Sequence, residues 1–197
     1  MYNTKTAIVT ESDSNYMPAG INENVVIKEV NIKKSPTDKD FLEIIFENEA
    51  GKTATMTEWK NEKNQWTVTD EDLQKRDNIQ FGRILQVIEA HCPNGIEDKE
   101  FNTFLEMITW VKETLDKAEK VKLRLKVSYD NKGYTKVSTY GRFVENMNIK
   151  KEESSIKKFA RDLFERPIIA DKEKSSDPLT NPSTSTPETS TDDDLPF

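Results

Sequence analysis

The sequence has one cysteine, Cys92, and one histidine, His91, among its 197 residues. A single cysteine leaves no partner for a disulfide framework, which fits a reducing cytosol. The two side chains are adjacent, but without a second pair of ligands they cannot build an ordinary zinc site. With only six glycines, the chain has neither a phosphate-binding loop nor a dinucleotide-binding glycine motif. We therefore expect no bound metal and no cofactor.

Long apolar runs are also missing. No stretch approaches the roughly twenty apolar residues that a membrane span needs, and the first five residues lack the pattern of a secretory signal. We therefore expect a cytoplasmic protein that does not associate with membranes. No internal repeat of solenoid or propeller type is found.

Carboxylates are abundant, with 36 Asp and Glu against 29 Lys and Arg. They are scattered at surface-like positions, and no pair can be assigned as acid and base from its spacing. Because no active-site constellation is recognisable, we expect that the protein is not an enzyme. Composition alone still leaves a metal-dependent nuclease open.

Negative charge is concentrated at the end of the chain. Residues 175–197 contain no Lys or Arg, five acidic residues, ten Ser or Thr and four prolines. Such a segment cannot bury enough apolar surface to offset its ordering entropy, so residues 171–197 are predicted to form a disordered acidic tail. The tail carries most of the net charge of −7. Residues 1–170 are therefore close to neutral, and their length suits one domain.

The last six residues combine charge with an apolar anchor: Asp192, Asp193, Asp194, Leu195, Pro196 and Phe197. Exposed apolar side chains at an acidic terminus work against solubility. A partner protein can use all of them, with a pocket for the ring and basic side chains for the carboxylates. These six residues are therefore predicted to bind partner proteins.

The body of the chain begins with strand patterns at residues 24–34, 41–46 and 52–59. Two helices are predicted next, one over 73–90 with Thr69 as its N-cap, and one that begins near Asp98.

The second half of the body returns to strand patterns. Residues 121–129 alternate between apolar and basic or polar side chains, so one face is expected to be core and the other cationic. A turn at 130–133 leads to a returning strand at 134–144. Residues 119–151 hold nine basic and three acidic side chains. Segment 154–165 is predicted to be an amphipathic helix packed on the domain, with a partner-binding or oligomer helix as the alternative.

This element order is that of an oligonucleotide-binding (OB) fold. We predict a mainly β chain with helices: a five-stranded OB-fold barrel with an enlarged helical insertion between strands 3 and 4, followed by the disordered acidic tail. The helical stretch 70–117 also suits a different barrel or an α+β domain. The ending Asp-Asp-Asp-Leu-Pro-Phe closely resembles the acidic tip of phage and bacterial single-stranded DNA-binding proteins, and residues 20–25, 131–134 and 140–143 resemble that family more loosely.

The resemblance implies binding of single-stranded DNA without sequence preference. Such strands are held by bases that stack on aromatic rings within a basic groove. Tyr134 and Tyr140 share a polar face with Lys136 and Arg142, which favours DNA contact, whereas Trp59 and Trp66 suit either base stacking or capping of the barrel. The predicted DNA-binding residues are Lys122, Arg124, Lys126, Lys132, Tyr134, Lys136, Tyr140, Arg142, Trp59, Lys60 and Trp66.

The predicted function is to coat and protect single-stranded DNA in replication and recombination. The resemblance implies that the tip recruits replication and recombination proteins, and the sequence suits a monomer or a small homo-oligomer. The alternative is an adaptor that docks on replication proteins and does not bind DNA. The cationic face at Lys122, Arg124 and Lys126 separates the two, because an adaptor does not need it.

Overall fold

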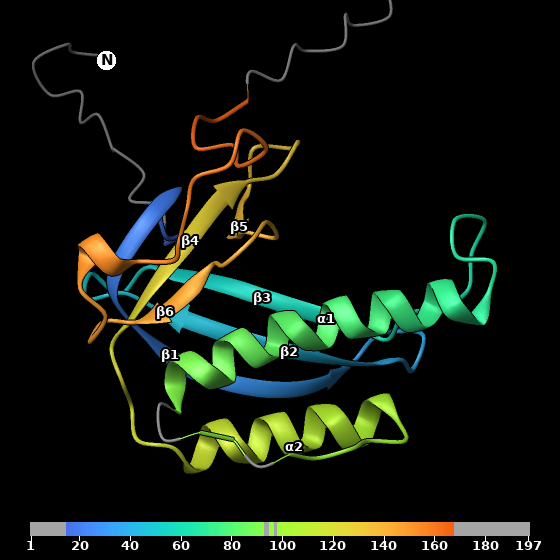
Figure 1. Cartoon of the computed structure of the whole chain (residues 1–197). Coiled ribbons are helices and arrows are strands. Elements are labelled where there is room, and N and C mark those ends of the chain that lie inside the picture. The colour runs from blue at the N-terminus through green and yellow to red at the C-terminus, as the bar shows by residue number, and fades with distance from the viewer. Residues whose placement is uncertain (1–14, 93–94, 97, 168–197) are drawn as a thin grey trace, which may run out of the picture. The chain divides into compact units, whose positions relative to one another are not determined.

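The computed structural model describes residues 15–92, 95–96 and 98–167. The predicted tail and tip, and the predicted domain boundary at 170/171, lie outside these residues. The described elements, in chain order, are β1 (Gly20–Lys34), β2 (Asp40–Glu47), β3 (Thr53–Trp59), α1 (Asp70–His91), α2 (Phe104–Lys117), β4 (Leu123–Tyr129), β5 (Thr135–Val137), β6 (Val144–Asn146) and the short 3-10 helix η1 (Lys151–Glu153) (Figure 1).

The strands form one antiparallel sheet in the order β3-β2-β1-β4-β5. Both β5 and β6 pair with β4, β5 along residues 127–129 and β6 along residues 123–125, so together they fill one strand position. Strand β5 also contacts β3 at the opposite edge. The chain is therefore mainly β, with a nearly closed five-strand antiparallel barrel and two helices.

Strand β1 is long enough to pair with a different strand along each of its two parts. Its first part pairs with β4 and its later part with β2, and the register with β4 shifts between Asn22 and Val25. Asn24 lies at this shift with φ of 56°, a left-handed conformation that asparagine tolerates better than most residues. The irregularity bends β1 and lets the sheet curl.

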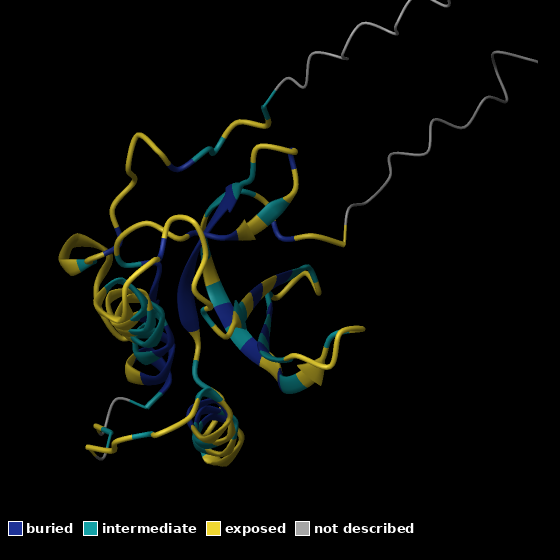
Figure 2. Cartoon of the chain, turned by 90° about the vertical axis from the view of Figure 1, so that its right-hand side faces the viewer, coloured by how far each residue is buried: buried dark blue, intermediate teal, exposed yellow. Residues whose placement is uncertain are grey.

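The core lies between the strands and the two helices. Leu42, Ile44 and Phe46 on β2 are fully buried, and they share one cluster with Ile84 of α1 and Ile108 of α2. Figure 2 shows buried residues along the strands and on the sheet-facing side of α1, with exposed residues on its outer side.

The helix starts follow from capping side chains. Thr69 accepts a hydrogen bond from the Asp72 backbone N–H, as predicted. Helix α2 begins at Phe104, later than predicted, because Thr103 and Glu106 form a reciprocal capping box there. Within the described residues, no helix is long and apolar enough to cross a membrane.

Two sequence predictions about the end of the domain are wrong in detail. The returning strand at 134–144 is interrupted after Val137 and resumes as β6. Segment 154–165 is not a helix: after η1 the chain runs irregularly and then turns. Its apolar residues have helical spacing, but its backbone is used by strand β4, since the Tyr129 N–H donates to the Leu163 carbonyl at 2.7 Å.

Candidate nucleic-acid interface

The polar face of β4 is buried, so the predicted open cationic face is wrong for Arg124 and Lys126. The Arg124 side chain forms ion pairs with Glu145 and with Glu23, and Arg124 is only 4% exposed. Burial acts to raise the pKa of Glu145. Hydrogen bonds from Ser154 and Arg124 outweigh this effect, so the pKa lies below its ordinary value.

Lys126 is completely buried and has all of its donors satisfied. Its ammonium donates to the Tyr140 carbonyl at 2.8 Å, to the Lys157 carbonyl at 2.9 Å and to Asp162 Oδ2 at 2.8 Å. An ammonium has three N–H groups and here each has an acceptor. Lys126 therefore has no free donor for a phosphate.

Asp162 completes this buried pair. Besides Lys126, it accepts hydrogen bonds from the Ser138 hydroxyl at 2.5 Å and from the Phe159 N–H at 2.9 Å. Burial acts to raise the pKa of Asp162, but the hydrogen bonds from Lys126, Ser138 and Phe159 outweigh it, so the pKa lies below its ordinary value.

The prediction of an open cationic face on β4 is wrong because another segment of the chain covers that face. Alternation along a strand shows that it has two different faces, but it does not show whether the polar face meets water or another segment. Residues 154–167, hereafter the strap, cover this face of β4. Lys122, at the edge, is exposed as expected, but it forms an ion pair with Glu49 at 2.9 Å.

Three predicted DNA-binding residues do come together around a hollow of about 350 Å³ next to the β4–β5 turn. Lys132, Lys136 and Tyr140 line it, together with Asp130 and Arg161. Arg161 comes from the strap and is not among the predicted DNA-binding residues, because segment 154–165 is predicted as a helix packed on the domain. We call this site the hairpin hollow.

The rings beside the hairpin hollow are accessible. Tyr134 is 65% exposed and Tyr140 is 40% exposed. Among the described residues, Lys132, Lys136 and Arg161 form no ion pair by their side chains. The hairpin hollow thus combines these three cations with the open ring of Tyr140, and the open ring of Tyr134 lies in the adjoining turn, outside the lining of the hollow.

The turn that carries these residues is held by its own backbone. Asp130 Oδ1 accepts hydrogen bonds from the N–H groups of Lys132 at 2.8 Å and Tyr134 at 2.9 Å. The backbone hydrogen bond from Tyr134 is the main cause that lowers the pKa of Asp130. Gly133 has φ of 76°, and a Cβ there would lie 3.1 Å from Arg166 Nε, so the strap also packs against the turn.

Arg142 does not belong to this hollow. Its guanidinium pairs with Glu89 of α1 at 3.1 Å, and Arg142 is not among the lining residues. Between Tyr140 and Arg142, in the irregular segment that joins β5 to β6, Gly141 has a positive φ of 60°, a conformation that glycine adopts easily.

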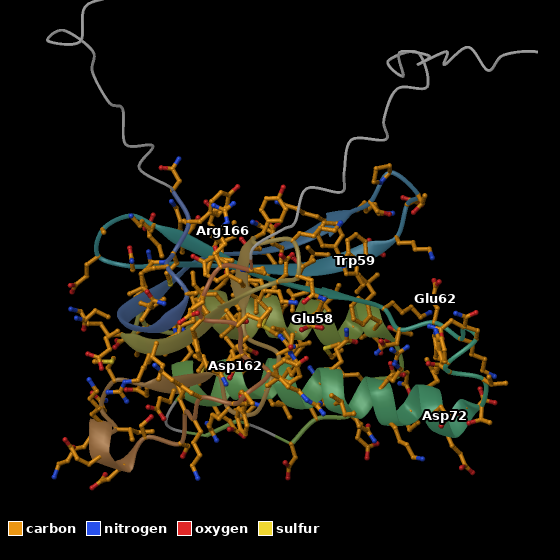
Figure 3. All side chains as sticks on the ribbon, turned by 90° about the horizontal axis from the view of Figure 1, so that it is seen from above. Glu58, Trp59, Glu62, Asp72, Asp162 and Arg166 are labelled. Carbon is orange, nitrogen blue, oxygen red and sulfur yellow. The ribbon has the colours of Figure 1, made fainter. Side chains whose placement is uncertain are left out.

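Trp59 and Lys60 lie at a second cleft, of about 670 Å³, formed around the loop of residues 60–64. Trp59 stacks on Phe41 with ring centroids 4.1 Å apart and remains 44% exposed. Figure 3 shows Trp59 and Glu62 on the side of the molecule where α1 begins, away from Asp162. Charges at this cleft are mixed, since Lys39 pairs with Glu62 at 2.8 Å.

Trp66 is 81% exposed. Of the two roles left open by the sequence, capping of the barrel is therefore wrong for this ring. Its exposure leaves the indole free for a ligand. Trp110, by contrast, packs with Phe101 at a centroid distance of 5.1 Å and has a structural role.

Comparison with known proteins finds no family model and no curated protein that matches this sequence. Within the described part of the chain, no group of three or more His, Cys, Asp or Glu side chains is placed to hold a metal ion. The functional assignment therefore rests on the chemistry of the hairpin hollow and of the Trp59 cleft.

Proposed function

We propose that this protein binds single-stranded DNA without sequence preference through an OB-fold domain, and that it coats and protects the strand in replication and recombination. The observation that carries the proposal is the hairpin hollow, where unpaired Lys132, Lys136 and Arg161 lie beside Tyr140. Three cations face one carboxylate, Asp130, in this hollow, so the site has excess positive charge for phosphates, and bases supply flat surfaces that exposed rings can stack on.

The strand order supports the OB-fold part of the proposal. The sheet runs β3-β2-β1-β4-β5, and α1 and α2 follow β3 in the chain and precede β4. We assign the helices as an enlarged insertion between strands 3 and 4 of this fold. The β4–β5 hairpin then corresponds to a loop that OB folds commonly use for oligonucleotides.

The Trp59 cleft is proposed as a second contact for the same strand. Trp59 and Trp66 offer exposed indole surface, and Lys60 lies beside Trp59. Its mixed charge makes it a weaker phosphate site than the hairpin hollow, since Lys63 pairs with Asp70 at 2.6 Å. We expect its contribution to come from stacking more than from charge.

An adaptor that binds only proteins is the second candidate. Burial of Arg124 and Lys126 favours it, because it removes most of the cationic face that separated the two functions. The hairpin hollow favours DNA binding, because its cations can contact phosphates and the Tyr140 ring can stack on a base. We propose no catalytic activity and no cofactor, a cytoplasmic location, and a monomer or small homo-oligomer.

The test of DNA binding is a fluorescence titration with oligo-dT at several salt concentrations. Affinity should fall steeply with salt, and Lys132→Ala or Lys136→Ala should each reduce the slope of log K against log salt by roughly 0.7, the value for one phosphate contact on a single strand. Lys117→Ala on α2, a lysine outside the hairpin hollow and the Trp59 cleft, is the control and should leave the slope unchanged. A flat salt response of the unchanged protein would contradict the proposal.

The acidic tip, Asp192 to Phe197, is proposed to recruit replication and recombination proteins. Deleting Phe197 should abolish partner binding and spare DNA binding, because a ring in a pocket with a paired carboxylate is the kind of anchor that dominates affinity. Replacing the three aspartates with asparagine should mainly slow association. The measurement is surface binding to purified replication proteins of the same cell. Equal binding by the shortened and full chains would show that the tip is not the contact.

A further inference from the structure

We propose that the strap is part of the DNA site: Arg161 contacts the strand, and the buried Lys126 is a positioning residue that holds Arg161 and Tyr140 around the hairpin hollow. This inference rests on the proposed function and adds a positioning role for Lys126, which that function does not use. It starts from the fact that one ammonium joins three segments that are far apart in the sequence.

The first segment held by Lys126 is the loop after β5. The ammonium binds the carbonyl of Tyr140, whose ring lines the hairpin hollow. The next residue, Gly141, lies directly under the Phe159 ring of the strap, since a Cβ at Gly141 would be 2.4 Å from that ring. The loop and the strap therefore fit together only because this position has no side chain.

The second segment is the strap itself, which Lys126 holds at two points. It binds the Lys157 carbonyl and the Asp162 carboxylate, and its Nζ lies 4.8 Å from the centroid of the Phe159 ring. Arg161 lies between these two fixed points in the sequence, and the carbonyl of Leu163, two residues further on, accepts the Tyr129 N–H. The backbone on both sides of Arg161 is thus tied to β4.

The hydrogen bonds that join β4 to the loop and to the strap require a lysine at position 126. Three acceptors surround the ammonium, two of them carbonyls of different segments, and a compact cation with three donors satisfies all of them. A planar guanidinium has a different shape and donor geometry. The buried pair is internally neutralised, so its role toward DNA is to place other groups, and the charge that reaches the strand is that of exposed Arg161.

The first experiment compares two single variants of the strap by oligo-dT titration. Arg161→Ala should weaken binding severalfold at low salt and lower the salt slope by roughly 0.7. Lys157→Ala is the matched control: it removes one exposed charge that does not line the hollow, and it keeps the carbonyl that Lys126 binds. Equal salt slopes in these two variants would overturn the role of Arg161.

The second experiment tests positioning without leaving a buried charge unpaired. In Lys126→Met/Asp162→Asn both charges are removed together, and the amide can still pair with Ser138, so the variant is expected to fold. It should bind oligo-dT more weakly than the unchanged protein. Adding Arg161→Ala to it should cost much less than the same change in the unchanged protein, because contacting residues that act as a unit are not additive.

The outcomes separate this inference from the proposed function. If the unchanged protein binds oligo-dT and Arg161→Ala costs the same in both backgrounds, the positioning role of Lys126 is wrong and the DNA-binding function stands. If the double variant does not fold, Gly141→Ala replaces it, because it pushes Phe159 away without touching a charge, and the same comparison applies. If the unchanged protein does not bind oligo-dT, the function and this inference both fall.

Discussion

Replacing Asp162 with alanine should destabilise the folded protein by about 3–5 kcal/mol, because it leaves the ammonium of Lys126 buried without its counter-charge. Both side chains are completely buried, and water cannot replace the lost carboxylate at low cost. Ser138, which donates to the other carboxylate oxygen, loses its acceptor as well. The measurement is urea unfolding of the single variant and the unchanged protein.

Two further variants serve as a control and as a recovery test for this prediction. Glu152→Ala in η1 removes an exposed carboxylate from the same part of the chain and should change the free energy of unfolding by less than about 0.5 kcal/mol. Lys126→Met/Asp162→Asn should recover much of the loss, since removing both charges of a buried pair is often neutral. A cost below about 1 kcal/mol for Asp162→Ala would mean that the strap leaves β4 easily and is not an integral part of the domain.

The buried carboxylates of Asp162 and Glu145 determine how the stability of the domain responds to acid. The pKa values of Asp162 and Glu145 in the folded protein lie below their ordinary values. These carboxylates therefore contribute their full stabilisation when the pH is above their pKa in the unfolded protein, about 4. The stabilisation is lost as the pH falls through their lower pKa in the folded protein. The unchanged protein should lose stability below about pH 4, and Asp162→Ala should lose less over the same range, because one of the two groups is gone.

Local features of the fold could be predicted from the sequence because local chemistry decides them. The cap at Thr69, the turn at 130–133 and the alternation on β4 each depend on residues within a few positions of one another. A mainly β chain with a five-strand barrel and two helices could also be anticipated from the strand and helix patterns.

The position of the strap over the polar face of β4 could not be predicted in the same way. Segment 154–165 has apolar residues at helical spacing, and its preference for an irregular path comes from distant groups, above all Lys126 and Glu145. Ser154 and the Ser155 N–H both donate to Glu145. These bonds satisfy a buried carboxylate from another strand, and a helix that began at Ser154 would use the same groups for its own cap.

The candidate site was predicted in part for the same reason. Lys132 and Lys136 lie within the β4–β5 hairpin and Tyr140 lies in the loop directly after it, so closeness in the sequence brings them together. Arg161 enters the hollow from the strap, whose hydrogen bonds with Lys126 and Tyr129 of β4 are contacts between segments far apart in the sequence. One signal was available: the basic residues around 157–166 follow closely on the positive patch of residues 119–151.

Removing the exposed rings of Tyr140, which lines the hairpin hollow, and of Tyr134 in the adjoining turn should have the largest effect on DNA binding. Stacking of one base on one ring is worth about 1–3 kcal/mol, so Tyr134→Ala/Tyr140→Ala should weaken oligo-dT binding by about 2–6 kcal/mol, roughly 30-fold or more. The fold should be unaffected, because the structural contacts at both positions are made by main-chain atoms. The Tyr134 N–H donates to Asp130 and the Tyr140 carbonyl accepts from Lys126, and alanine keeps both groups.

The matched control is Tyr134→Phe/Tyr140→Phe, which keeps the rings and removes only the hydroxyls. If stacking is the contact, this variant should bind oligo-dT nearly as the unchanged protein does, and the salt slope should be the same in all three proteins, because no cation is lost. If the alanine variant keeps full affinity, the bases do not stack on these tyrosines. Trp59 and Trp66 then become the leading candidates, since they are the exposed rings of the second proposed contact, and Trp59→Ala/Trp66→Ala should show the loss instead.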